Sequence, residues 1–161
     1  MFVRTASERD LHAVSRLIGE AMHDTFDGLY GASMVSSIVT ALYSREALRR
    51  VMGLSRSEFL VADDGEAIAG VAFAAAEAEE GRVVDILGGF VTPSRQGHGI
   101  GGLLLDELEA SFFESERIRV EIDSRNLRAV SFLTGEGYER KGERREEQLD
   151  ATLVTFDKPL V

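Results

Sequence analysis

The fold is decided by Thr92-Pro-Ser-Arg-Gln-Gly-His-Gly-Ile-Gly-Gly102, a glycine-rich stretch in the second half of the chain. The mostly apolar run Val83–Val91 precedes it and predicts a strand buried on both faces, and a helical pattern starts at Leu103. Glycine has no Cβ, and the first N–H groups of a helix have no acceptor within it. A phosphate group can therefore approach several amides at once, and the stretch predicts an anion site.

Two alternatives for this loop fit the rest of the chain less well. One or two glycines would indicate only a tight turn, but four lie close together at Gly97, Gly99, Gly101 and Gly102. Their spacing matches the dinucleotide pattern, and an acidic residue follows about twenty residues on, as that pattern requires. However, too little chain follows for further βαβ units, and the strands before the loop are joined by a hairpin. No Gly-Lys-Ser/Thr sequence follows either, which disfavours a nucleoside-triphosphate loop.

Before the loop, the sequence predicts a strand, two helical regions and a hairpin. Phe2–Ala6 is strand-like, and a capping box then starts a helix. Its apolar face has the helical period and comprises Leu11, Val14, Leu17, Ile18, Ala21 and Met22. We expect a loop at His23–Tyr30, where the rhythm breaks, and a loosely helical region from Ala32 to Met52. Phe59–Ala62 and Ile68–Ala76 then form a hairpin around Asp63–Glu66, and a polar connection follows at 77–82.

After the loop, one crossover completes the domain. A helix is expected from Leu103 to about Ser115, a strand at Arg117–Asp123, and a short helix from Asn126 to Thr134 that ends at Gly135 or Gly137. Further strands are expected near Tyr138 and across Ala151–Phe156. The whole chain, residues 1–161, therefore predicts a single α/β domain, in which a strand meander precedes one strand–loop–helix–strand unit.

Composition excludes several classes of protein. The net charge of −10 and pI of about 4.8 argue against a nucleic-acid partner and mildly favour a cationic small molecule. The absence of cysteine excludes disulfides, thiol nucleophiles and cysteine-bound metals, and the histidines at 12, 23 and 98 are scattered, so no metal site is expected. No apolar run could span a membrane and no signal peptide is evident, so we expect a cytoplasmic protein without a membrane partner.

The loop resembles the acetyl-CoA loop of the GNAT superfamily of N-acetyltransferases. That family's pattern, Gln/Arg-x-x-Gly-x-Gly/Ala, is met by Gln96, Gly99 and Gly101. Its second signature, an Asn, an Ala and an aromatic–Tyr pair before Gly-Phe, is approximated by the stretch Asn126–Tyr138. The resemblance implies a GNAT-like α+β domain. In that fold a mixed, mostly antiparallel sheet of six to seven strands contains a splayed parallel central pair and is flanked by about four helices.

The resemblance also implies where acetyl-CoA would bind. The loop amides would hold the diphosphate, and the pantetheine arm would fill the wedge between the strands Val83–Val91 and Arg117–Asp123. Arg125 is a further candidate for the CoA phosphates, although for each arginine a solvated surface charge is the alternative. The residues placed on acetyl-CoA by the resemblance are Gly89, Phe90, Val91, Arg95, Gln96, Gly97, His98, Gly99, Ile100, Gly101, Gly102, Asn126 and Arg128.

Acetyl transfer to an amine requires a base, because an ammonium ion has no lone pair. Holding an alkylamine neutral at pH 7 costs roughly 4–5 kcal/mol, and a positioned carboxylate removes the proton directly or through water. Asp85 lies where many members of the family carry a glutamate base, and Glu121 on the neighbouring strand is the second candidate. The alternative for either is a charge on the rim. In the family, a backbone N–H of the splayed strand stabilises the thioester oxygen.

One family residue is missing. The tyrosine that often protonates the leaving thiolate would fall at position 133, which is Leu133. Tyr138 is expected to pack in the core, and Ser131 or Thr134 could act only through water. The resemblance therefore implies an N-acetyltransferase, and a non-catalytic acyl-CoA-binding or sensing module is the alternative.

The acceptor side is indicated by the segment His23–Tyr30, which resembles the PaiA-like polyamine acetyltransferases. Carboxylates beside aromatic rings suit a small cationic amine, so we expect Asp24, Phe26, Asp27 and Tyr30 to line its site. A connecting loop without a ligand is the alternative. The tail resembles enzymes that acetylate protein N-terminal amines, which keeps a protein or amino-acid acceptor open. A homodimer is compatible with the sequence.

Overall fold

The computed structural model describes residues 1–77 and 81–160 and contains one seven-stranded sheet. The strand order is β1-β2-β3-β4-β5-β7-β6, and β4 and β5 form the parallel pair at its centre. This confirms the mixed, mostly antiparallel sheet expected from the sequence. The strands are β1 (Phe2–Thr5), β2 (Ser57–Asp63), β3 (Ile68–Ala76), β4 (Val83–Val91), β5 (Arg117–Asp123), β6 (Glu139–Glu146) and β7 (Ala151–Pro159).

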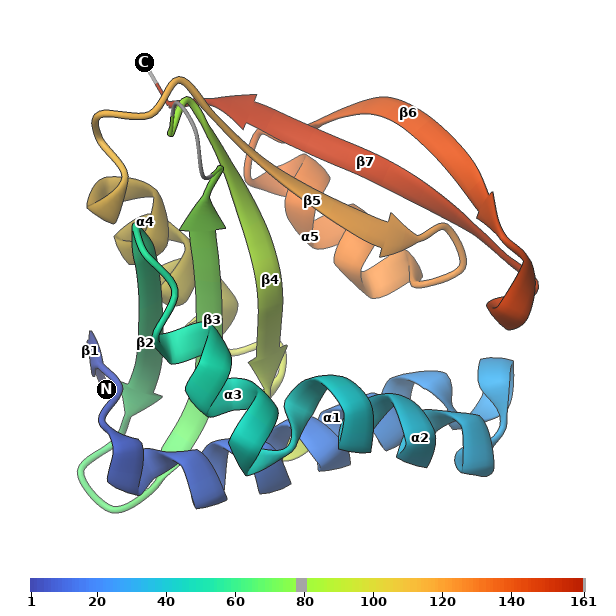
Figure 1. Cartoon of the computed structure of the whole chain (residues 1–161), viewed down its shortest axis with the longest axis horizontal. Coiled ribbons are helices and arrows are strands. Elements are labelled where there is room, and N and C mark those ends of the chain that lie inside the picture. Colours follow the sequence, from blue (N-terminus) through green and yellow to red (C-terminus); the bar gives the residue numbers. More distant parts are fainter. Residues whose placement is uncertain (78–80, 161) are drawn as a thin grey trace.

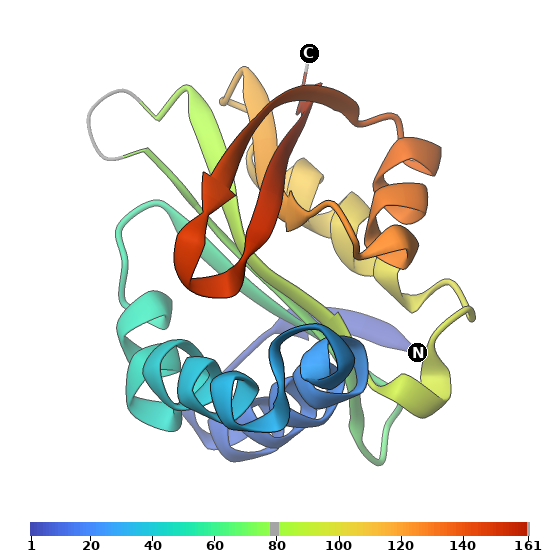
Figure 2. The same cartoon turned by 90° about the vertical axis from the view of Figure 1, so that its right-hand side faces the viewer.

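Helices cover both faces of the sheet. Figures 1 and 2 show α1, α2 and α3 grouped on one side, with α4 and α5 on the other. A hydrophobic core lies on each face of the sheet, because side chains alternate between the two faces along every strand. In β2, Leu60 and Ala62 face α4, whereas Phe59 and Val61 face α1 and α3. The helices are α1 (Leu11–Tyr30), α2 (Ala32–Tyr43), α3 (Arg45–Met52), α4 (Ile100–Ser111) and α5 (Leu127–Gly135). No helix of the described residues is long and apolar enough to cross a membrane.

The parallel strands β4 and β5 separate soon after they pair. Their ladder covers only the register from Val83↔Arg117 to Asp85↔Arg119, the shortest in the sheet. Beyond Asp85, β4 continues along β3 while β5 continues along β7, so the two strands diverge (Figure 1). Backbone groups that would pair across a closed sheet therefore face the gap between them. This is the splayed pair that the resemblance to the acetyl-CoA loop implies.

A bulge lies in β4 where it leaves β5. The register changes from Ala74↔Ile86 to Phe73↔Gly88, which leaves Leu87 as the extra residue. Gly88 lies directly beneath the ring of Phe73, because a Cβ built there would come within 2.3 Å of the ring. The ring of a large core residue thus occupies the space that a side chain at 88 would need.

The expected loop at His23–Tyr30 is wrong, because α1 continues to Tyr30 and ends at Gly31, whose φ is +87°. Phe26 and Tyr30 follow Met22 at helical spacing, and their rings stack with centroids 4.8 Å apart. The expected single region Ala32–Met52 is two helices, because Ser44 adopts an extended conformation and caps α3 by accepting from the amide of Ala47. The described residues therefore form five α-helices, in agreement with the about four that the resemblance implies.

Other boundaries also shift. The strand expected to be buried on both faces is only partly so, since Val84 is its one buried residue and Leu87 is 40% exposed. Loss of the β5 neighbour after Asp85 explains that exposure. The helix after the glycine loop starts at Ile100 rather than Leu103 and ends at Ser111. The capping box between Ser7 and Asp10 is confirmed. In the polar connection 77–82, residues 78–80 lie outside the described residues.

Candidate functional site

The glycine loop presents a run of unpaired amides at the start of α4. In the part of the chain that the structure describes, none of the backbone N–H groups from Gly97 to Gly102 donates to a protein acceptor. Gly97 and Gly99 both have φ of +82°, and no atom lies within 4 Å of a Cβ built at either residue. Because the positive end of the α4 dipole adds to these donors, the loop has the chemistry of a diphosphate site.

Hydrogen bonds and an ion pair hold the first part of the loop, up to His98. The side-chain amide of Gln96 donates to the carbonyl of Val91 over 3.2 Å, and Nδ1 of His98 lies 3.0 Å from the carbonyl oxygen of Arg95. The Arg95 guanidinium is paired at 2.9 Å with Asp64 in the β2–β3 turn, so its side chain is directed away from a free phosphate contact. Gln96 Oε1 is buried without a donor among the described residues.

The gap between β4 and β5 fits an extended arm with amide groups. Gly89, Phe90 and Val91 form the end of β4 beside the gap, and alternate backbone groups of a strand point away from its paired neighbour. No atom lies within 4 Å of a Cβ built at Gly89, so the backbone is open to close approach. Together with the orphan acceptor of Gln96 and the free amides of the loop, these residues fit coenzyme A.

Both candidate bases lie on the sheet face covered by α1–α3, and both are ion-paired. Asp85 Oδ1 accepts from Nε of Arg119, its register partner on β5, over 2.5 Å. Glu121, two residues further along β5, accepts from two nitrogens of Arg144 over 2.7 and 2.9 Å. Their side chains are 40% and 38% exposed. The geometry brings both carboxylates to the region where β4 and β5 diverge, and each is bound by a guanidinium.

Near α5, two of the residues predicted to bind coenzyme A or considered for it, Asn126 and Arg125, make contacts within the protein. Asn126 caps α5, since its Oδ1 accepts from the amide of Ala129 over 3.3 Å. Arg128 is exposed on the first turn of α5, whereas Arg125 is bound to Asp123 over 2.9 Å. Among the arginines predicted to bind the cofactor, Arg128 is therefore the one whose side chain has no partner in the described part of the chain.

The hydroxyls of Tyr138 and Thr134, near the position of the missing tyrosine, both donate to protein acceptors. Leu133 is buried in the core beneath α4. The Tyr138 hydroxyl donates to Glu109 over 2.8 Å, and burial together with this bond raises the pKa of Tyr138 well above its usual value. The hydroxyl of Thr134 donates to the carbonyl of Val130. Tyr138 thus packs in the core, as its position in the sequence predicts.

The four predicted acceptor residues lie on the last turns of α1, where Phe26 and Tyr30 stack and the hydrogen bonds of Tyr30 and Asp27 go to different partners. Tyr30 donates to Asp123 on β5, whereas Asp27 accepts from His23 on its own helix. Burial and the bond to Asp123 raise the pKa of Tyr30 well above its usual value. Burial disfavours the ionised form of Asp123, but hydrogen bonds from Arg125 and Tyr30 outweigh it and lower the pKa of this carboxyl.

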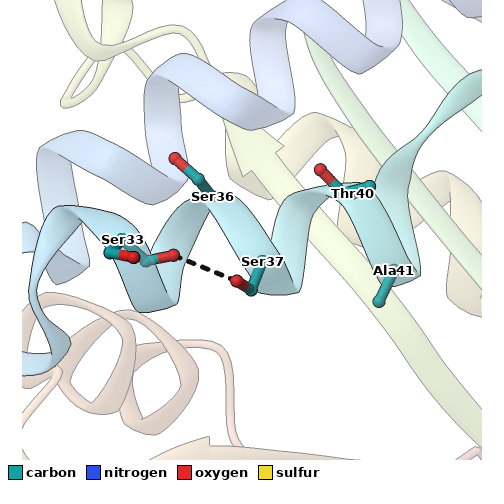
Figure 3. Close-up of a pocket in the computed structure, with 5 residues that line it drawn as sticks. All are labelled: Ser33, Ser36, Ser37, Thr40 and Ala41. Atoms are coloured by element: carbon teal, nitrogen blue, oxygen red, sulfur yellow. Dashed lines mark hydrogen bonds between the residues drawn. The ribbon is translucent and has the colours of Figure 1, made fainter.

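A shallow hollow that the sequence did not predict lies along the exposed face of α2. Figure 3 shows its lining, in which Ser36 and Thr40 project from one side of the helix, and the Ser37 hydroxyl donates to the carbonyl of Ser33 over 3.2 Å. The hollow measures about 470 Å3. The sequence could have indicated this hollow, because hydroxyl residues recur at helical spacing within Ala32–Tyr43. The lining residues are Ser33, Ser36, Ser37, Thr40 and Ala41.

Metal chemistry finds no support in the side chains. Within residues 1–77 and 81–160, no three His, Asp or Glu side chains converge as metal ligands would.

Comparison with known proteins identifies the family. Residues 29–150 match the family model for the GNAT acetyltransferase domain. No curated protein sequence matches the chain. Among solved structures, the PaiA N-acetyltransferase of Thermoplasma acidophilum in complex with coenzyme A superposes with a TM-score of 0.85 at 20% identity, over 96% of each chain.

Two further structures show the same fold. The ribosomal-protein-S18-alanine N-acetyltransferase of Escherichia coli has a TM-score of 0.75 at 14% identity, covering 99% of this chain and 93% of its own. The YncA protein of Salmonella typhimurium, solved with acetyl-CoA, has a TM-score of 0.72 at 17% identity, covering 99% and 94%.

Proposed function

Because this chain belongs to the GNAT family of acetyltransferases, we propose that it transfers the acetyl group of acetyl-CoA to the primary amine of a small cationic acceptor, with a polyamine favoured. The observation that carries the proposal is the row of unpaired amides from Gly97 to Gly102, placed at the point where β4 has left β5. A diphosphate on the amides and an extended arm in the gap would use both features.

Acetyl-CoA supplies an acyl group that is already activated as a thioester. The chain holds its diphosphate with the amides of the loop, and Arg128 adds a positive charge nearby. Gly89 and Val91 offer backbone groups to the pantetheine arm. The similar proteins from Thermoplasma acidophilum and Salmonella typhimurium were solved with coenzyme A and acetyl-CoA, which supports this choice.

The acceptor must lose a proton before it can attack. Asp85 or Glu121 takes that proton, directly or through water, and each must then share its oxygens between the substrate and an arginine. Asp85 has the shorter side chain, so a water molecule between it and the amine is the more natural path. A backbone N–H of β4 beside the bulge at Leu87 is the donor for the oxygen on which negative charge develops.

A polyamine is favoured for two reasons. The chain carries a net charge of −10, which attracts cations, and its fold resembles the PaiA structure at a TM-score of 0.85. The likeness to the S18-alanine enzyme keeps a protein N-terminal amine as the second candidate acceptor. Leu133 keeps a non-catalytic acyl-CoA-binding module as the alternative from another class.

A thiol-release assay separates these functions. Purified protein is mixed with acetyl-CoA and a panel containing diamines, polyamines, free amino acids and a peptide that begins with alanine. Rapid release with the diamines and polyamines supports the proposal, whereas release with the peptide alone moves the acceptor to protein N-termini. Tight acetyl-CoA binding measured by calorimetry, with no release for any amine, would identify a binding module.

A further inference from the structure

Tyr43 is the one tyrosine whose hydroxyl makes no hydrogen bond in the part of the chain that the structure describes. The chain has three tyrosines, and the hydroxyls of the other two are in use. Tyr30 donates to Asp123 over 2.7 Å. Tyr138 donates to Glu109 over 2.8 Å, inside the core. If a phenol takes part in the chemistry of this protein, Tyr43 is therefore the residue that can supply it.

The hydroxyl of Tyr43 is open to a ligand and carries its proton at neutral pH. The residue is half-buried. Within residues 1–77 and 81–160, Gln96 Oε1 is the only fully buried side-chain oxygen or nitrogen without a partner, so the unbonded oxygen of Tyr43 is accessible. Burial of the ring raises the pKa of Tyr43 above its usual value of about 10, which keeps the phenol protonated.

The ring of Tyr43 lies against β4, on the sheet face that also carries the two candidate bases. Its centroid is 5.3 Å from that of Phe90 and 6.5 Å from that of Phe73, and both contacts are edge-to-face. The Phe73 ring covers Gly88, and Phe90 follows two residues further along β4. The phenol therefore lies beside the part of β4 between the bulge and the glycine loop, which borders the gap between β4 and β5.

The break between α2 and α3 holds Tyr43 in this position. Tyr43 is the last residue of α2, and its carbonyl accepts a 2.8 Å hydrogen bond from Ser15 Oγ on α1. Ser44 then directs the chain into α3 with an extended backbone. The backbone of Tyr43 is thus bonded to α1 while its ring packs on two core rings. A side chain that acts on a reacting atom needs this kind of support.

Acetyl transfer from a thioester requires a proton at sulfur. When the amine nitrogen bonds to the acetyl carbon, the C–S bond breaks and its electron pair stays on sulfur. An alkyl thiol has a pKa of about 8.5, so at pH 7 the leaving thiolate takes up a proton. The nitrogen loses one proton and the sulfur gains one, which balances the reaction. A positioned acid that supplies this proton while the bond breaks accelerates such a step by about 10²- to 10⁴-fold.

We propose that the hydroxyl of Tyr43 donates a hydrogen bond to the sulfur of acetyl-CoA and gives it a proton as the C–S bond breaks. The phenolate regains a proton from the one that Asp85 or Glu121 removes from the amine, through water. The assignment rests on the proposed function, because it needs acetyl-CoA in the gap. Leu133 cannot supply this proton, and Tyr43 reaches the gap from the opposite face of the sheet.

Fluorine NMR tests the contact with sulfur without turnover. The chain has three tyrosines and no tryptophan, so protein labelled with 3-fluorotyrosine gives three signals, which the variants Tyr30→Phe, Tyr43→Phe and Tyr138→Phe assign. Coenzyme A and desulfo-coenzyme A, which lacks only the sulfur atom, are titrated separately. We expect the Tyr43 signal to shift more with coenzyme A than with desulfo-coenzyme A, and the Tyr138 signal to stay in place. Equal shifts of Tyr43 with the two ligands, or no shift with either, would overturn the assignment.

Kinetics of Tyr43→Phe provides the second readout. We expect kcat with a diamine to fall about 10²-fold, whereas the Kd for acetyl-CoA measured by calorimetry changes by less than about twofold. The variant should unfold at the wild-type temperature, because its hydroxyl has no hydrogen bond to lose. Tyr138→Phe is the matched control, since it removes a bonded hydroxyl from the core and should lose stability but keep its kcat. Full kcat in Tyr43→Phe, or an equal loss in both variants, would contradict a proton donor at Tyr43.

The proposed function and the role of Tyr43 fail on different results. If amines release thiol from acetyl-CoA while Tyr43 responds equally to coenzyme A and desulfo-coenzyme A, the transferase function stands and the assignment of Tyr43 is wrong. If calorimetry detects binding of neither ligand, the proposed function itself fails, and the role of Tyr43 fails with it.

Discussion

Tyr30 Oη donates a 2.7 Å hydrogen bond to Asp123 Oδ2, which joins the last residue of α1 to the last residue of β5. These two elements lie on opposite sides of the opening that forms when β4 and β5 diverge. Asp123 has a side chain only 2% exposed and also accepts from the Arg125 guanidinium, which lies 5.8 Å from the Tyr30 ring centroid. The opening is therefore bounded at its far end by a buried, fully bonded carboxylate.

Tyr30→Phe removes this bond and leaves the ring. We expect a loss of about 1–2 kcal/mol in the free energy of unfolding, because Asp123 stays buried with one donor fewer. Urea unfolding at pH 7 measures the change. Phe26→Leu, which removes the stacked neighbour without touching Asp123, is the comparison for lost packing. A Tyr30→Phe variant as stable as the wild type would show that the bond contributes nothing net.

Acid should destabilise the protein through Asp10 and Asp123. The hydrogen bonds from Arg4 hold the pKa of Asp10 well below its usual value, and the pKa of Asp123 is also lowered. Because both carboxyls are stronger acids in the folded state, their stabilisation is complete above the unfolded pKa of about 3.9 and is lost as pH falls below it.

Asp10→Asn tests the acid effect. The variant should lose about 1–3 kcal/mol at pH 7 and should show a weaker fall in stability below about pH 4 than the wild type does. Urea unfolding, measured at intervals of about one pH unit between pH 3 and pH 7, gives both quantities. Glu8→Gln, at an exposed ion pair with Arg49, is the control. Parallel pH curves for wild type and Asp10→Asn would contradict the assignment.

Gly88→Ala should destabilise the core. Its Cβ would lie 2.3 Å from the Phe73 ring, so that ring must move, at a cost of about 1–3 kcal/mol. Gly89→Ala is the matched control for stability, since no atom lies within 4 Å of its Cβ. Thermal unfolding measures the melting temperature of both variants. Equal melting temperatures would mean that the Phe73 ring can move aside at no cost in stability.

Gly99→Val should abolish coenzyme A binding and keep the fold. Gly99 is the N-cap of α4 with φ of +82°, and a β-branched side chain there both strains the loop and covers its amides. We expect a stability cost of about 1–2 kcal/mol and a loss of affinity in calorimetry far beyond that cost. Gly65→Val places the same residue at φ of +97° in the β2–β3 turn and should bind coenzyme A normally. Normal affinity in Gly99→Val would remove the loop from the binding site.

Asp85→Asn and Glu121→Gln distinguish the two candidate bases. The variant that lacks the true base should lose about 10²- to 10⁴-fold in kcat/KM, most at low pH, where free amine is scarce. Profiles of kcat/KM against pH with a diamine measure this. Arg119→Met frees Asp85 and Arg144→Met frees Glu121 from its ion pair. These variants show whether a change in the pH profile results from loss of the ion pair rather than from loss of a base. An unchanged profile in Asp85→Asn would assign the role to Glu121 or to solvent.

The glycine loop and the sheet were predictable from sequence because they follow from local rules. Four clustered glycines after an apolar run specify the turn from β4 into α4, and apolar runs with hairpin signals specify the strands. The end of α1 was missed because Asp24, Asp27 and Gly28 interrupt the apolar stripe. Phe26 and Tyr30 continue that stripe at spacing of four, and their partners on other elements are not visible in the sequence.

The site was predictable to a smaller extent. The loop residues carry their own signal, but the ion pairs of Asp85 and Glu121 depend on Arg119 and Arg144, which the register of β5 with its neighbours brings into contact. Strand register over such distances is set by the whole sheet and not by neighbouring residues. The same holds for the partial exposure of β4, which results from a missing neighbour.

The short β4–β5 ladder gives the molecule a natural division into two lobes, β1–β4 with α1–α3 and β5–β7 with α5. An extended molecule inserted between them would act as replacement rungs and couple the lobes mechanically. Those amide hydrogens of β5 beyond Arg119 that point away from β7 should then exchange more slowly when coenzyme A is bound, so cosubstrate binding would complete the central sheet as well as deliver an acyl group.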